Sequence, residues 1–182
     1  MKIYSADNIL PISDEPIKGG AVLVRDGRIA AIGEKNSIAA RFPETEIEEF
    51  GDAVIMPGFV NAHSHLELSI LRGFLDAYDD DFSSWLIKLT NTRREKLDER
   101  DIELSAMFGA LEGITAGVTC FADIGRYGEA GFRALCKTRL RGILFQETEF
   151  SPDSRTANVD FEKLSDKFES IRQRETDLVK VG

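Results

Sequence analysis

Polar and apolar residues alternate over the first 53 residues in the way that short, half-exposed strands do. The segment AVLVRDGRIAAIG has two apolar runs around Asp26-Gly27, and Asp-Gly is a strong short-range signal for a β-hairpin. A short helix is predicted over Ser37–Arg41, and TEIEEF, residues 45–50, alternates again like a strand. We therefore expect residues 1–53 to form a small antiparallel sheet.

From residue 54 the pattern changes to buried strands that alternate with helices. AVIMPGFVNAH is apolar almost throughout, as expected of a strand that is buried on both faces. The predicted strands are Val54–Ala62, Val118–Asp123, Ile143–Glu147 and Leu178–Val181. The predicted helices are a pair between residues 81 and 116, the second capped by Asp98, one over residues 129–140, and one that begins at an Asn158 cap. This alternation predicts a parallel α/β sheet built from right-handed crossovers.

The composition and net charge indicate which partners and which cellular compartment to expect. The chain has 182 residues, 42% of them hydrophobic and 30% charged, which is ordinary for a soluble globular protein with a sizeable core. A net charge of -9 argues against nucleic acid or an anionic membrane as partner. The N-terminus has no apolar stretch like that of a signal peptide, and no apolar run reaches the roughly 18 residues that span a bilayer. With two cysteines, we expect a cytoplasmic protein.

Both histidines of the chain lie in the stretch MPGFVNAHSHLELS, as His63 and His65, where the first buried strand ends. Side chains two residues apart on an extended strand point to the same face. Parallel α/β folds collect their catalytic groups at this end of the strands. Imidazole nitrogens bind divalent metals at about 2.0–2.1 Å. The pair is therefore a candidate half of a metal site, and two structural histidines satisfied by hydrogen bonds are the alternative.

The segment MPGFVNAHSHLELSILRG, with GITAGVTCFAD and the weaker RGILFQE, resembles the amidohydrolase superfamily, in its cytosine deaminase and chlorohydrolase-like branch. The resemblance implies an α/β fold in which residues 54–182 form the first half, about four strands, of a (β/α)8 TIM barrel. Residues 1–53 would then be the N-terminal part of a small β-sandwich domain. It also implies that His63 and His65 bind a divalent metal, zinc or in some members iron.

The resemblance implies a metal-dependent hydrolase that acts on a carbon–nitrogen bond through metal-activated water. The stretch HSHLELSILRG is most similar to aminodeoxyfutalosine and S-adenosylhomocysteine deaminases, so we expect a nucleoside or heterocyclic amine as substrate. A triazine-type chlorohydrolase or aminohydrolase is the alternative within the enzyme class. A non-catalytic scaffold is the alternative outside it, although a scaffold need not keep either histidine. A homo-oligomer is compatible with all three.

Relatives in the superfamily take two further histidines, an aspartate and an acid/base glutamate from later strands. The chain has no third histidine, so we expect these groups beyond Gly182 and no catalytic residue within this chain. Two ligands fall short of the three that a hydrolytic zinc site needs. We therefore expect the 182-residue chain to be a fragment that is inactive alone, and a shortened product without the ancestral activity is the alternative.

Three residues are predicted to contact substrate: Glu67, Arg72 and Trp85. Glu67 would share the face of the two histidines if the strand continued so far, and a solvated or capping acid is its alternative. Arg72 would contact substrate, pair with Glu67 or lie free on the surface. Trp85 would line the pocket or pack in the core. The predicted strands end at Asp123 and Glu147, whose roles stay open between catalysis and capping.

Overall fold

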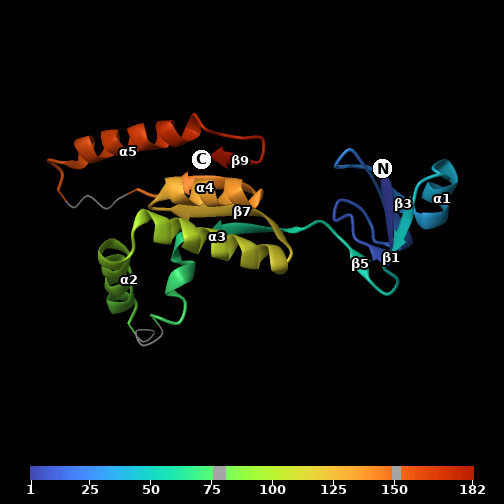
Figure 1. Ribbon diagram of the computed structural model, residues 1–182, viewed down its shortest axis with the longest axis horizontal. Helices are drawn as coiled ribbons and strands as arrows, with labels where there is room; N and C mark the ends of the chain where they lie inside the picture. The colour runs from blue at the N-terminus through green and yellow to red at the C-terminus, as the bar shows by residue number, and fades with distance from the viewer. Residues whose placement is uncertain (76–80, 149–152) are drawn as a thin grey trace. The chain divides into compact units, whose positions relative to one another are not determined.

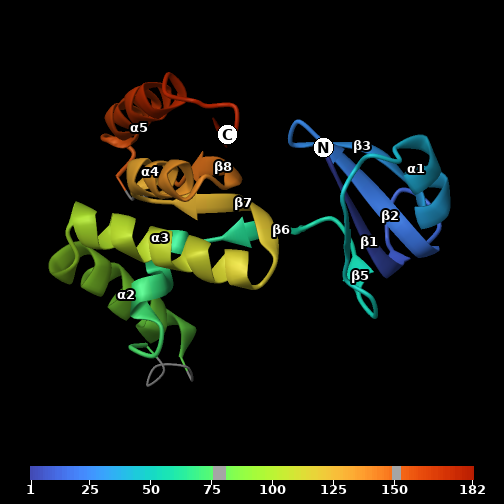
Figure 2. The same cartoon turned by 45° about the vertical axis from the view of Figure 1, so that its right-hand side comes forward.

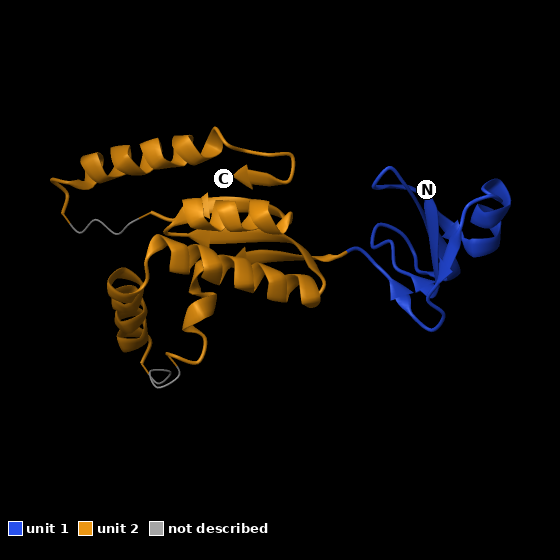
Figure 3. Cartoon of the chain, in the orientation of Figure 1, with its two compact units in different colours: residues 1–57 blue, residues 58–182 orange. Residues whose placement is uncertain are grey.

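The computed structural model describes residues 1–75, 81–148 and 153–182, and its chain forms two compact units, residues 1–57 and 58–182 (Figure 3). The predicted boundary at residues 53 and 54 lies four residues before this division. The reason is that the predicted strand Val54–Ala62 is two strands, which corrects the prediction. β5 (Val54–Ile55) pairs with the sheet of the first unit, and β6 (Phe59–Ser64) belongs to the second. Pro57, which has no N–H to donate, lies between them.

The first unit is a five-stranded sheet with one helix. Its elements are β1 (Lys2–Ile9), β2 (Ile17–Arg25), β3 (Arg28–Glu34), α1 (Lys35–Arg41), β4 (Ile47–Glu49) and β5. The strand order is β3-β2-β1-β4, and β5 also pairs with β1. The hairpin at Asp26-Gly27 is confirmed, and both residues have positive φ, 52° and 72°, as a type I′ turn requires. The expectation of an antiparallel sheet is wrong for β4 and β5, which run parallel to β1.

The second unit contains the predicted parallel sheet. Its elements are β6, the 3-10 helix η1 (Leu66–Leu71), α2 (Phe82–Lys96), α3 (Glu99–Thr115), β7 (Val118–Gly125), α4 (Gly128–Thr138), β8 (Arg141–Gln146), α5 (Ala157–Arg172) and β9 (Val179–Val181) (Figure 1). The strands pair in the order β6-β7-β8-β9, and every pair is parallel, as the strand and helix alternation predicts. Among the described residues, no helix is long and apolar enough to cross a bilayer.

Local hydrogen bonds determine where α3 and α5 begin. Asp98 caps α3 as predicted, and a capping box forms because Asp98 accepts from the Asp101 N–H while Asp101 accepts from the Asp98 N–H. The predicted Asn158 cap of α5 is wrong, since the N-cap is Thr156. The carbonyl of Asp153 accepts from the N–H groups of Thr156 and Ala157, and this turn starts the helix earlier.

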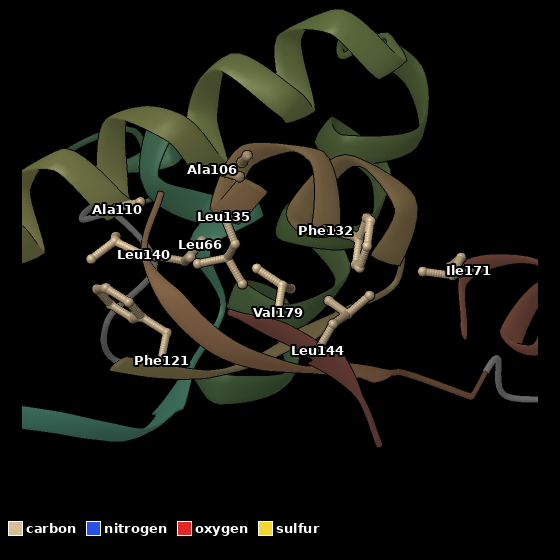
Figure 4. Packing of buried hydrophobic residues seen from close by; sticks show 11 residues of the cluster. Leu66, Ala106, Ala110, Phe121, Phe132, Leu135, Leu140, Leu144, Ile171 and Val179 are labelled. Atoms are coloured by element: carbon tan, nitrogen blue, oxygen red, sulfur yellow. The ribbon is translucent and has the colours of Figure 1, made fainter. Parts of the chain in front are cut away.

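Helices α3 and α4 cover one face of the sheet (Figure 2). Burial alternates along β8, where Leu144 is fully buried beneath the helices and Ile143 and Phe145 on the other face are 41% and 39% exposed. Eleven buried residues form the core between sheet and helices (Figure 4): Leu66, Ala106, Ala110, Phe121, Phe132, Ala134, Leu135, Leu140, Leu144, Ile171 and Val179. Because the strands are parallel, their carboxyl ends meet at one edge of the sheet, and the chain reaches His65 at that edge.

Candidate metal centre

The two histidines lie side by side where β6 ends. Their ring centroids are 5.1 Å apart, and the ring planes are inclined at 79°. His63 is exposed and His65 is half-buried. The sequence spacing predicted neighbouring rings, and this geometry places two imidazoles within reach of a common ligand.

A backbone carbonyl fixes the tautomer of His65. Its Nδ1 lies 2.9 Å from the carbonyl oxygen of Ile124 in β7. A carbonyl oxygen can only accept a hydrogen bond, so Nδ1 carries a proton, and in the neutral ring Nε2 then holds the lone pair. Metal-binding histidines commonly donate their second ring nitrogen to a carbonyl or carboxylate in this way. His65 is thus prepared to bind a cation through Nε2.

A β-bulge interrupts the pairing of β6 with β7 beside the histidines. Asn61 pairs with Phe121 and Ser64 pairs with Asp123, so three residue steps on β6 match two on β7. The backbone N–H of His63 lies within this bulge and donates to the Asn61 side-chain oxygen at 3.2 Å. Bulges often re-aim side chains next to active sites. Side-chain hydrogen bonds therefore replace the regular ladder at this point.

Asp123 is fully buried beneath these residues. Its Oδ1 accepts from the Ser64 hydroxyl at 3.1 Å and from the Leu66 N–H at 2.8 Å. Its Oδ2 has no hydrogen-bond partner among the described residues. Burial raises the pKa of Asp123 to about 6, with Glu67 adding to the rise, against the lowering effect of the two hydrogen bonds and of His65.

The prediction that a strand ends at Asp123 is corrected, because β7 continues to Gly125. Asp123 shares the helix-facing side of β7 with buried Phe121, two residues away. It caps the start of η1, not the segment that follows its own strand. The predicted Glu147 lies one residue after β8, and its N–H donates to the Gly125 carbonyl at 3.0 Å.

The expectation that Glu67 shares the face of the histidines is wrong, because the extended backbone ends at Ser64 and Glu67 lies in η1. Its side chain is 2% exposed and forms an ion pair with Arg93 of α2, itself 7% exposed. Its second oxygen accepts from the Tyr127 N–H at 3.0 Å. The Arg93 guanidinium also lies 5.9 Å from the Tyr127 ring centroid. Glu67 therefore ties η1 to α2 and to the loop after β7.

Arg72 pairs with Glu112 of α3, not with Glu67, through two parallel hydrogen bonds of 2.6 and 2.7 Å. It lines a cavity of about 500 Å³ together with His65 and Glu112. Segments of β6, η1, α3 and β7 contribute the other walls of this cavity. Arg72 thus shares a cavity wall with His65.

Trp85 packs in a small apolar cluster with Leu71, Leu75 and Leu89, which corresponds to the core-packing alternative. Its ring stacks on Phe82 with centroids 5.9 Å apart. Over the described residues, no three side chains of His, Cys, Asp or Glu gather in a way that could hold a metal ion. No sequence pattern indicated the contributions of Arg93, Tyr127 and the Ile124 carbonyl. The one available signal is that Arg93 follows Leu89 by four residues and so lies on the same face of α2.

Sequence relatives of this chain include deaminases. Residues 54–182 match the amidohydrolase family, and residues 20–44 match an imidazolonepropionase-like composite domain of bacteria. A 5-methylthioadenosine/S-adenosylhomocysteine deaminase from Nitratidesulfovibrio vulgaris is 34% identical over 125 residues, which are 69% of this chain and 28% of that relative. The chain therefore spans less than a third of the length of this relative.

Solved structures share the fold over the whole chain. The Helicobacter pylori aminofutalosine deaminase in complex with methylthio-coformycin has a TM-score of 0.82 at 21% identity and covers 100% of this chain, which spans 43% of it. The atrazine chlorohydrolase from Arthrobacter aurescens TC1, complexed with zinc, has a TM-score of 0.80 at 14% identity, with 100% and 46% covered. These likenesses confirm the predicted fold, part of a TIM barrel preceded by a β-rich segment. Since the family match spans 54–182, well over half of the sequence, this chain belongs to the amidohydrolase family.

Proposed function

We propose that the protein that carries this chain is a metal-dependent amidohydrolase that hydrolyses a carbon–nitrogen bond and releases ammonia from a nucleoside or heterocyclic amine. His63 and His65 bind the divalent metal, zinc in the first instance and iron as the alternative. The observation that carries the proposal is the pair of adjacent rings at the carboxyl edge of a parallel sheet, with Nδ1 of His65 committed to the Ile124 carbonyl. That hydrogen bond leaves Nε2 as a metal donor.

The residues of this chain hold and orient the metal donors. The Ile124 carbonyl keeps His65 in the tautomer that a cation needs, and Asn61 holds the backbone of His63. When bound, a divalent ion at such a site supplies a water molecule whose pKa is lowered toward neutrality. The nearby carboxylates of Glu67 and Asp123 are buried and already hydrogen-bonded, so we assign proton transfer to a group outside this chain.

The sequence relative favours an adenosine-type amine as substrate. The deaminase from Nitratidesulfovibrio vulgaris is 34% identical, whereas the atrazine chlorohydrolase shares the fold at 14% identity, which carries no argument about substrate. Arg72 is the residue that we propose as a substrate contact, because it shares a cavity with His65. Both cysteines are free, and the proposal places the enzyme in the cytoplasm.

The test uses the full-length protein that carries this sequence. Bound metal is measured after dialysis, and ammonia release is measured with 5′-methylthioadenosine and S-adenosylhomocysteine. His63→Asn and His65→Asn should each lose metal and turnover, since even outer partners of a ligand change affinity by about 10- to 100-fold. Arg172→Ala, an exposed change on α5, is the matched control and should retain both.

Three results would argue against the proposal. Retention of metal and turnover in both histidine variants would refute the assigned ligands. Wild-type protein without metal and without turnover would favour the non-catalytic scaffold. Release of chloride from a chlorotriazine, with no ammonia from either nucleoside, would favour the chlorohydrolase alternative.

A further inference from the structure

Ser64, the last residue of β6, and the two residues that follow it each form hydrogen bonds to the end of β7. The Ser64 hydroxyl donates to Asp123 Oδ1 at 3.1 Å, and it is also 3.1 Å from the Ala122 carbonyl. His65 Nδ1 donates to the Ile124 carbonyl at 2.9 Å. The Leu66 N–H donates to Asp123 Oδ1 at 2.8 Å. One carboxylate oxygen therefore holds both neighbours of His65.

Strand pairing does not provide this restraint by itself. The bulge between Asn61 and Ser64 breaks the regular register of β6 on β7 immediately before His65. After Ser64 the strand ends, and His65 has φ −129° and ψ 73°, outside the dihedral angles of both strand and helix. The backbone around His65 therefore depends on the hydrogen bonds to Asp123, whereas a residue inside a regular strand is also held by the backbone hydrogen bonds of the ladder.

Asp123 acts from beneath the site and does not face the end of the strands. It is fully buried on the helix-facing side of β7. A Cβ atom at Gly131 of α4 would lie 2.7 Å from its Oδ2, so α4 packs directly against the carboxylate. A group enclosed in this way is placed to orient its neighbours, and it has no open path to a substrate.

We infer that Asp123 is a positioning residue for the metal centre: its buried Oδ1 holds the backbone on both sides of His65 and so orients the imidazole toward the metal. The inference rests on the proposed role of His65 as a metal ligand. It adds the buried carboxylate of Asp123 on β7 to the Ile124 carbonyl as a determinant of the site. Asp123 acts here as a hydrogen-bond acceptor and not through its charge, because the Ser64 hydroxyl and the Leu66 N–H are both neutral donors.

The experiment measures zinc affinity of the full-length protein by competition with a chromophoric chelator. Asp123→Ala removes the acceptor and should weaken zinc binding by about 10- to 100-fold, the range of outer partners of metal ligands. Asp123→Asn keeps a side-chain oxygen and should bind zinc within a few-fold of wild type. Ile171→Ala, a buried change on α5 in the same core, is the control for general destabilisation and should leave the affinity unchanged.

A second readout reports ligand geometry without turnover. The absorption spectrum of bound Co²⁺ should change in Asp123→Ala and stay as in wild type in Asp123→Asn. If Asp123→Ala does not fold, Ser64→Ala decides, since it removes one of the two bonds with little change in volume. Zinc affinity in Ser64→Ala equal to that of wild type would then overturn the inference.

Failure of the inference and failure of the proposed function give different results. Wild-type zinc affinity in Asp123→Ala, equal losses in Asp123→Ala and Ile171→Ala, or equal losses in Asp123→Ala and Asp123→Asn would each refute the positioning role alone. A wild-type protein that binds no zinc, or a His65→Asn variant that binds it as tightly as wild type, would instead refute the proposed function.

Discussion

The buried ion pair between Glu67 and Arg93 should be a main determinant of how η1 and α2 are held together. We consider the substitution Arg93→Met, which keeps most of the side-chain volume and removes the charge. Glu67 is 2% exposed, so its carboxylate would remain in the interior with the Tyr127 N–H as its remaining donor among the described residues. Removal of one partner of a buried pair costs about 3–5 kcal/mol, because the other charge is left uncompensated.

The neighbouring residue on the same helix provides a matched control. Arg94 pairs with Glu95, and the two side chains are 67% and 54% exposed. Exposed pairs contribute about 0–1 kcal/mol, so Arg94→Met should leave the free energy of unfolding almost unchanged. The same substitution at adjacent positions should therefore differ by at least about 2 kcal/mol.

Urea unfolding followed by tryptophan fluorescence is the assay. Trp85 is the only tryptophan of the chain and lies on α2, the helix that carries Arg93. The double variant Glu67→Gln, Arg93→Met removes both charges and should recover a large part of the loss, because no unpaired charge remains. Equal free energies of unfolding for Arg93→Met and Arg94→Met, or a double variant as unstable as the sum of its singles, would refute this reasoning.

Three further predictions concern stability. Because the pKa of Asp123 is raised to about 6, its ionised form destabilises the fold. The free energy of unfolding should be highest below about pH 4 and should fall by about 3 kcal/mol as the pH rises through about 6. Urea unfolding with a chelator at both pH values should show this decline for wild type and not for Asp123→Asn. Asp98→Ala should lower the free energy of unfolding by about 1 kcal/mol through loss of the capping box, whereas an equal effect of the exposed change Arg100→Ala would contradict this. Leu135→Ala, at a fully buried core position, should cost about 2–5 kcal/mol in the same assay, and a cost below about 1 kcal/mol would show that the site collapses around the cavity.

The sequence by itself determined the order of the elements and the location of the histidine pair. Asp26-Gly27 specifies its hairpin because both residues adopt positive φ angles in a type I′ turn, whose twist matches that of the strands. Asp98 with Asp101 specifies the start of α3. These signals act over a few residues, so they can be read without the fold. The spacing of His63 and His65 is equally local, and their rings are adjacent as the spacing predicts.

Only the tertiary structure decided what surrounds the histidines. Glu67 belongs to the same short motif, yet its partner Arg93 lies 26 residues along the chain, and the pair exists because α2 packs over η1. Asp123 is 57 residues from Leu66, and its burial against α4 depends on the register of β6 on β7, including a bulge that no residue pattern announces. The separation of β5 from β6 at Pro57 likewise depends on the pairing of β5 with β1 in the first sheet. Hydrogen bonds and ion pairs between distant segments are set by packing, whereas local propensity sets turns and caps.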